Sequence, residues 1–207
     1  MPSDLGTHLP GHGDDSSGRR GSNPRDLALE RGEAMLLVVD VQEKLSLAMQ
    51  PDALARAVKN AAILVRAAVR LGLPVVASEQ YVKGLGPTVP ALRELFPEPA
   101  LEKLEFSCGA NKLLARKIML SQRHQIIVVG MEAHVCVFQT VRDLARGDFS
   151  VFVPQDAVVS RTEENRQIGL RLCERAGATL TSTETVLFDL LGVAGTAEFK
   201  ELSPLIR

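Results

Sequence analysis

Residues 125–137 read QIIVVGMEAHVCV, a continuous apolar run followed by a glycine-containing turn and the start of a helical segment. A short apolar run of this kind is typical of a strand buried in a parallel sheet. Cys136 follows that strand, where an α/β sheet presents reactive groups at its carboxyl edge. A thiol at a helix N-terminus experiences the positive end of the helix dipole, which favours the thiolate. The stretch therefore predicts an α/β fold with a nucleophilic cysteine at a strand end.

The rest of the chain alternates strand-like runs with helix-like periods. We expect strands at 36–39, 74–78, 101–106, 125–129, 149–153 and 179–181, and helices at 54–71, 90–96, 111–120, 133–146 and 162–176. The Gly- and Pro-rich stretch 79–100 is expected to be a long functional loop around the short helix. Such βαβ alternation predicts a three-layer αβα sandwich with a mostly parallel, Rossmann-like sheet.

Composition favours one cytoplasmic domain. The 207 residues carry a formal net charge of -1, so there is no bulk attraction to nucleic acid or to an anionic membrane. The sequence contains no apolar stretch of the ~20 residues that a membrane span requires. Its three cysteines cannot all pair, which favours a reducing cytoplasm.

The beginning of the chain differs from the remainder in composition. Residues 1–32 are rich in Gly, Ser, Pro, Asp and His and show almost no apolar periodicity. We expect a disordered tail there and a single folded domain at 33–207.

Two more residues stand at strand ends or within strands. Asp40 follows an apolar run and Lys103 lies in another, so both could meet Cys136 at the carboxyl edge if the strand of Lys103 is adjacent. A carboxylate that takes the thiol proton, an ammonium that stabilises negative charge and a sulfur nucleophile suit acyl chemistry. Taken singly, each has a structural alternative, since strand-end Asp often caps loops, Lys between glutamates is often solvated, and Cys often fills cores.

Several short motifs occur together in the chain. They are Val38-Val39-Asp40-Val41-Gln42, Lys103-Leu104-Glu105-Phe106-Ser107, Gly130 to Val137, Gln139-Thr140 with Asp143-Leu144, and Asp156-Ala157 with Ser160-Arg161. In combination they make residues 33–207 resemble the isochorismatase-like cysteine hydrolases, which include nicotinamidases and N-carbamoyl amide hydrolases. Glu79-Gln80-Tyr81 with Lys83-Gly84-Leu85-Gly86 is most similar to the subgroup called isochorismatase domain-containing proteins.

The resemblance implies a catalytic triad. Asp40 would be general base and then acid, Cys136 the nucleophile, and Lys103 an electrostatic support. It also implies a non-proline cis peptide between Met131 and Glu132, with the backbone N–H groups of Glu132 and Cys136 directed at a tetrahedral oxyanion. Homo-oligomerisation is expected on the same ground.

Further expectations concern the pocket. Gln42, Tyr81 and Phe106 are the candidate substrate-binding residues, with a core position equally open for Phe106. His134 either faces the pocket or sits in the first turn of the helix, and we favour the second. Ala133 and His134 stand where relatives often have Thr and an acidic residue, so the hydrogen bonds made there in relatives are in doubt.

The chain departs from nicotinamidases and from true isochorismatases. Nicotinamidases carry an Asp-x-His metal motif, whereas residues 78–90 contain no His. We therefore expect neither a catalytic metal nor a cofactor. Enzymes that hydrolyse isochorismate lack the cysteine, so Cys136 favours acyl transfer through a thioester.

These observations predict a cysteine hydrolase that cleaves a small amide, imide or carbamoyl-type C–N bond. The first alternative is a catalytically silent scaffold that keeps the triad only for packing. A phospho-acceptor signalling domain fits poorly, because Asp40 is not part of an acidic pair. A dinucleotide site fits less well still, because Val41-Gln42-Glu43 follows the first strand where a Gly-rich phosphate turn is required.

Overall fold

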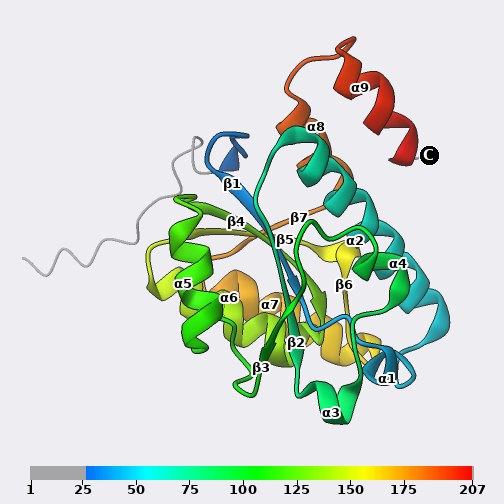
Figure 1. Cartoon of the computed structure of the whole chain (residues 1–207), viewed down its shortest axis with the longest axis vertical. Helices are drawn as coiled ribbons and strands as arrows, with labels where there is room; N and C mark the ends of the chain where they lie inside the picture. The colour runs from blue at the N-terminus through cyan, green and yellow to red at the C-terminus, as the bar shows by residue number, and fades with distance from the viewer. Residues whose placement is uncertain (1–26, 207) are drawn as a thin grey trace, which may run out of the picture.

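The computed structural model describes residues 27–206, in which a single seven-stranded sheet forms the centre of the molecule (Figure 1). The strands are β1 (Ala34–Val39), β2 (Val75–Gln80), β3 (Leu101–Lys103), β4 (Gln125–Met131), β5 (Ser150–Pro154), β6 (Val158–Val159) and β7 (Thr179–Thr181). Their order is β3-β2-β1-β4-β5-β7, with β6 paired to β4, and every pairing is parallel. The chain leaves β1 in one direction along the sheet and β4 in the other, so these two strands flank the switch point where such sheets bind ligands.

Helices cover both faces of the sheet and confirm the predicted three-layer fold. They are α1 (Glu43–Ser46), α2 (Pro51–Leu71), α3 (Val82–Leu85), α4 (Pro90–Arg93), α5 (Lys112–Leu120), α6 (Phe138–Arg146), α7 (Glu163–Arg175), α8 (Thr183–Leu191) and α9 (Ala197–Leu202). Buried residues of α2, α8 and α9 pack in one apolar cluster, and those of α5, α6 and α7 pack in the other. Figure 1 shows α5, α6 and α7 together on one side of the sheet and α2 on the opposite side.

The central strand β1 shows why its sequence is apolar throughout. Leu36 and Val38 belong to the cluster on the α2 side, whereas Leu37 and Val39 belong to the cluster on the α5 side. Successive side chains of a strand point to opposite faces, so a strand covered on both faces needs apolar residues at every position. The continuous runs in the sequence are therefore explained by the two helical layers.

Several features were not predicted from the sequence, among them the short helices α1 and α3. The predicted helix at 133–146 begins with a π-helical turn at Ala133–Val137 before α6 starts. β6 contains only two residues, too few to show a period. α8 and α9 follow the last predicted strand, although Ser182 and Thr196 cap them as ordinary N-cap residues do.

The described part of the chain begins before the predicted domain boundary. Leu29 is 5% exposed and belongs to the core cluster, and its N–H donates to Asp189 at 3.4 Å. Packing thus extends to residues that the sequence analysis placed in the tail. The remainder of the predicted tail, residues 1–26, lies outside the described residues. Among the helices that are described, none combines the length and apolar character needed to span a membrane.

Candidate active site

Asp40 begins the site at the carboxyl end of β1. It is fully buried, and its φ of 52° lies in the left-handed region, which Asp tolerates better than most residues. The neighbouring end of β4 lies very close, because a Cβ at Gly130 would be 2.0 Å from the Val39 carbonyl oxygen. Only glycine permits this approach, which brings the turn after β4 beside Asp40.

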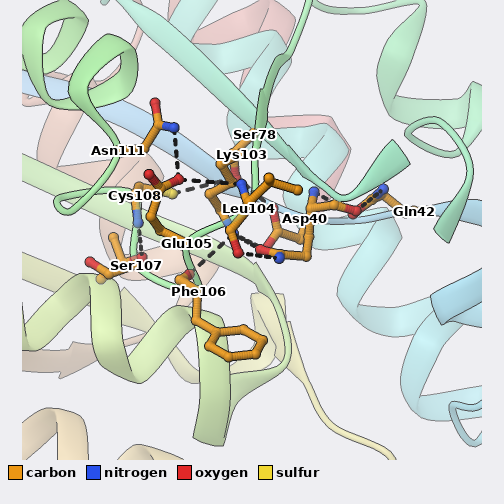
Figure 2. A network of polar contacts seen from close by, with 12 residues as sticks. Asp40, Gln42, Ser78, Lys103, Leu104, Glu105, Phe106, Ser107, Cys108 and Asn111 are labelled. Carbon is orange, nitrogen blue, oxygen red and sulfur yellow. Dashed lines mark hydrogen bonds and ion pairs between the residues drawn. The ribbon is translucent and has the colours of Figure 1, made fainter. Parts of the chain in front are cut away.

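Lys103 reaches Asp40 from the edge strand β3. From the sequence we expected Lys103 to reach Asp40 and Cys136 only if its strand were adjacent to theirs, but β2 lies between β3 and β1. The long lysine side chain spans β2, and its Nζ donates to Asp40 Oδ2 at 2.6 Å and to Gln80 Oε1 at 2.7 Å. A third bond, to the Phe106 carbonyl at 3.1 Å, completes the set shown in Figure 2.

The surroundings of Lys103 limit what its ammonium can do. An ammonium has three N–H donors, and these three acceptors match that number. Lys103 is 1% exposed, so the charge is buried together with the Asp40 carboxylate. Removing one partner of such a pair would leave an uncompensated buried charge. The geometry therefore makes Lys103 the residue that holds the Asp40 carboxylate in place and balances its charge. Direct donation from Lys103 Nζ to a substrate would require breaking one of these three hydrogen bonds.

Cys136 lies in the π-helical turn that follows β4 and is 6% exposed. Burial raises the pKa of its thiol above the ordinary value, and the charge of Asp40 and a hydrogen bond to that carboxylate raise this pKa further. The positive charge of Lys103 opposes these effects without cancelling them. The sequence argument from the helix dipole predicted a thiolate, and the structure contradicts it, because desolvation and a nearby carboxylate dominate. The resting group is a thiol beside the Asp40 carboxylate.

The turn that carries Cys136 is held by hydrogen bonds to Glu132. The N–H groups of Val135 and Val137 donate to the Glu132 carbonyl at 3.0 and 3.2 Å. The Arg161 guanidinium donates to both Glu132 carboxylate oxygens, at 2.9 and 3.3 Å. The peptide between Met131 and Glu132 is cis, as the resemblance implied. The turn is therefore fixed both at its backbone and through the Glu132 side chain.

His134 adopts the second of its two proposed roles. Its Nδ1 lies 3.1 Å from Ser160 Oγ, and its ring is half-buried. Like the ion pair of Glu132 with Arg161, this contact ties the cysteine turn to the segment after β6.

The three predicted substrate-binding residues differ in their surroundings. The Gln42 amide is buried, donating to the Gln80 and Gly86 carbonyls at 3.0 and 2.6 Å and accepting from the Gln80 N–H at 2.8 Å. It holds the loop after β2, and its contact with a substrate stays a prediction. Tyr81 and Phe106 are 50% and 53% exposed at the same edge of the sheet, and Figure 2 shows the Phe106 ring directed away from the polar cluster. Their contact with a substrate stays a prediction.

Sequence reasoning missed the buried residues that surround Asp40 and Lys103. Ser78, Gln80, Cys108 and Thr140 are buried polar or thiol groups within this cluster. A signal was present for two of them, because Ser78 and Gln80 are polar residues near the end of an otherwise buried strand. Within residues 27–206 no group of three or more His, Cys, Asp or Glu side chains is placed to hold a metal ion, and the absence of a metal stays a prediction.

Comparison with known proteins agrees with this geometry. The sequence model of the isochorismatase domain matches residues 34–185, from the first residue of β1 into α8. The chain belongs to the isochorismatase family. Its similarity to isochorismatase domain-containing protein 2 from Danio rerio, 34% identity over 175 residues covering 84% of this chain and 86% of the relative, confirms the predicted subgroup.

Other relatives of this isochorismatase-family protein have varied descriptions. The secreted isochorismatase effector Isc1 from Phytophthora sojae (strain P6497) is 36% identical over 180 residues, which cover 84% of each chain. Among solved structures, MAR1 ribonuclease from Caenorhabditis elegans superimposes with a TM-score of 0.79 at 35% identity, covering 86% of this chain and 92% of that one. The family and fold are thus shared by proteins to which different activities and locations are attributed.

Proposed function

We propose that this protein is a cysteine hydrolase that cleaves the C–N bond of a small amide, imide or carbamoyl compound through a thioester. The observation that supports it most is the buried ion pair of Asp40 with Lys103 beside the Cys136 thiol, at the switch point of the sheet. A purely structural ion pair would gain little from burial, because desolvation offsets its attraction. Next to a protonated thiol, however, the carboxylate of such a pair can serve as a general base.

The first half of the reaction forms the thioester. Asp40 accepts the proton of Cys136 Sγ as the sulfur attacks the substrate carbonyl carbon. The N–H groups of Glu132 and Cys136 then stabilise the oxygen that becomes negative. Protonated Asp40 next donates its proton to the substrate nitrogen, the C–N bond breaks, and the amine leaves.

The second half releases the acid. Asp40, again a carboxylate, accepts a proton from a water molecule that attacks the thioester carbonyl. The C–S bond breaks as the tetrahedral intermediate collapses, and Asp40 returns the proton to Cys136 Sγ. Lys103 stays bound to Asp40 throughout and stabilises the carboxylate form at the start of each half. Coupling of proton transfer to attack fits a thiol whose pKa is raised, because no free thiolate has to accumulate.

Hydrolysis of RNA, suggested by the description of the C. elegans relative, fits these residues less well. A polyanion is bound by accessible Lys and Arg side chains that replace its counterions. Lys103 is 1% exposed, and its donors are used inside the protein. We therefore expect a small uncharged acyl group at the nucleophile, and intact RNA after incubation with the enzyme.

Trapping of the acyl intermediate tests this function. Incubation with para-nitrophenyl acetate and a panel of small amides, followed by acid quench and peptide mass spectrometry, should place an acyl group on Cys136. Cys136→Ala should abolish the adduct, and Cys173→Ala, which alters a thiol outside the site, should retain it. An adduct on another residue, or turnover that survives Cys136→Ala, would overturn the proposal, whereas the absence of turnover on every amide would favour the silent scaffold.

Assembly and location stay predictions. Exposed apolar side chains on α5, Leu113 at 63% and Leu120 at 70%, line an open groove of about 700 Å³ and offer a surface for a homo-oligomer. Sedimentation equilibrium of the full chain tests this, and a monomer would contradict it. The predicted cytoplasmic location is likewise untested, and one relative is described as secreted.

A further inference from the structure

A chain of buried hydrogen bonds begins at Asp40 Oδ1, whereas Lys103 contacts the other carboxylate oxygen, Oδ2. The Ser78 hydroxyl donates to Asp40 Oδ1 at 2.7 Å, and the Cys108 thiol donates to Ser78 Oγ at 3.4 Å. The Cys108 N–H donates in turn to Thr140 Oγ1 at 2.9 Å. All four residues are 1% exposed or less, and Figure 2 shows Ser78, Cys108 and Asp40 within one cluster.

These bonds connect the base to the helix that follows the nucleophile. Asp40 ends β1, Ser78 lies on β2, Cys108 lies in the loop before α5, and Thr140 belongs to α6, which continues from the Cys136 turn. The chain of bonds therefore links Asp40, through the interior of the protein, to α6, the helix that continues from the Cys136 turn. Apart from Asp40 itself, none of these residues takes part in the proposed mechanism.

The direction of each bond is set by what each group can donate. A serine hydroxyl has one hydrogen, and because Ser78 donates it to Asp40, the Ser78 oxygen can only accept in its contact with Cys108. Burial raises the pKa of Cys108 to about 11, with the charge of Asp40 as a further cause. Cys108 is consequently a thiol at neutral pH and supplies its hydrogen to Ser78 Oγ. The serine hydrogen is thereby directed at the carboxylate.

The geometry of Asp40 depends on both of its donors. Its terminal torsion is broad, so a single bond to Lys103 would let the carboxylate plane rotate. Ser78 on Oδ1 and Lys103 on Oδ2 together fix that plane. The remaining lone pairs then have one orientation, and the Cys136 thiol lies close enough for Asp40 to raise its pKa.

We propose that Ser78, oriented by the Cys108 thiol, is a positioning residue that aims the Asp40 carboxylate at Cys136. This inference deepens the proposed function and rests on it, since it assigns a task to Asp40 in the same site. Ser78 and Cys108 touch no substrate, and their effect passes entirely through Asp40.

The infrared S–H stretching bands of the resting protein at neutral pH test the proposal without a substrate. The pKa values of all three buried cysteines are raised, so all three are thiols and give bands, which Cys108→Ala, Cys136→Ala and Cys173→Ala assign. Ser78→Ala should move the Cys136 band to higher wavenumber, because a rotated Asp40 accepts its proton less well. Ser78→Thr retains the hydroxyl and should restore the wild-type band. Cys108→Ala should move the Cys136 band in the same direction by less.

The outcomes separate positioning from packing. A Cys136 band that stays in place in Ser78→Ala, while the Cys108 band moves, would overturn the proposal, because Ser78 would then contact Asp40 without aiming it. If Ser78→Ala does not fold, the unchanged Cys136 band in Cys108→Ala is the result that overturns it. A shifted Cys136 band in a protein that forms no acyl adduct would support the positioning of Asp40 and reject the hydrolase.

Discussion

At the scale of single residues, Lys103 departs most from what its neighbours in the sequence suggest. Glu102 and Glu105 flank it as they would flank a solvated surface charge, and both are exposed. The Lys103 ammonium is nevertheless buried, and its partners come from residues 23 and 63 positions away as well as from the nearby Phe106 carbonyl. Its role as the partner of Asp40 therefore follows from strand pairing and not from local composition.

Truncation of Lys103 should destabilise the protein strongly. Lys103→Ala leaves the Asp40 carboxylate buried without its counter-charge, and we expect a loss of about 3–5 kcal/mol in the free energy of unfolding by urea. The double variant Lys103→Met with Asp40→Asn should recover much of this loss. Lys117→Ala is the matched control, because its pair with Glu98 is exposed and should contribute at most about 1 kcal/mol. Equal losses in Lys103→Ala and Lys117→Ala would contradict the buried-pair interpretation.

At the scale of elements, helix α7 packs against the π-helical turn Ala133–Val137 that carries Cys136. Gly169 lies in the middle of α7 and faces the turn, where a Cβ would be 2.5 Å from the Ala133 carbonyl carbon and 2.6 Å from the His134 nitrogen. Backbone atoms cannot move aside as a flexible side chain can. The absence of a side chain at this position lets the two elements pack backbone against backbone.

Gly169→Ala should therefore displace the turn that carries Cys136. Alanine is the better helix former by about 1 kcal/mol, yet overpacking against backbone typically costs about 1–3 kcal/mol, so we expect a net loss of stability. We also expect slower acylation of Cys136, because displacements of about 1 Å can reduce rates by about 100-fold. Gly32→Ala, where no atom lies within 4 Å of the added Cβ, is the control. Wild-type acylation and stability in Gly169→Ala would show that the turn does not depend on this contact.

At the scale of the whole molecule, the buried cysteines link stability to alkaline pH. Burial raises the pKa of Cys108 to about 11 and that of Cys173 to about 12, from an ordinary value of 9.0. Above pH 9 the unfolded chain loses these protons while the folded protein keeps them. The unfolded state then binds fewer protons, and stability falls as pH rises.

The contribution of Cys173 can be measured separately. Burial alone raises the pKa of Cys173, and no charged residue of the site contributes to this shift. We expect the urea-derived stability of the wild type to fall between pH 9 and pH 11 more steeply than that of Cys173→Ala, by about 1.4 kcal/mol per pH unit. Any cavity left by the alanine lowers stability equally at both pH values and so does not affect this difference. Identical pH slopes would mean that Cys173 ionises as readily in the folded protein as in the unfolded chain.

The sequence alone determined the fold class, the positions of most strands, and the candidates Asp40, Lys103 and Cys136, because apolar periods and strand ends are local properties of the chain. The residues around them depended on tertiary structure. Lys103 reaches its partner across β2, Gln42 is used inside a loop, and Ser78 meets Cys108 only after distant segments pair. Tertiary structure also decided that the pKa of Cys136 is raised. Desolvation and the nearness of Asp40 arise from packing and leave no pattern in the sequence.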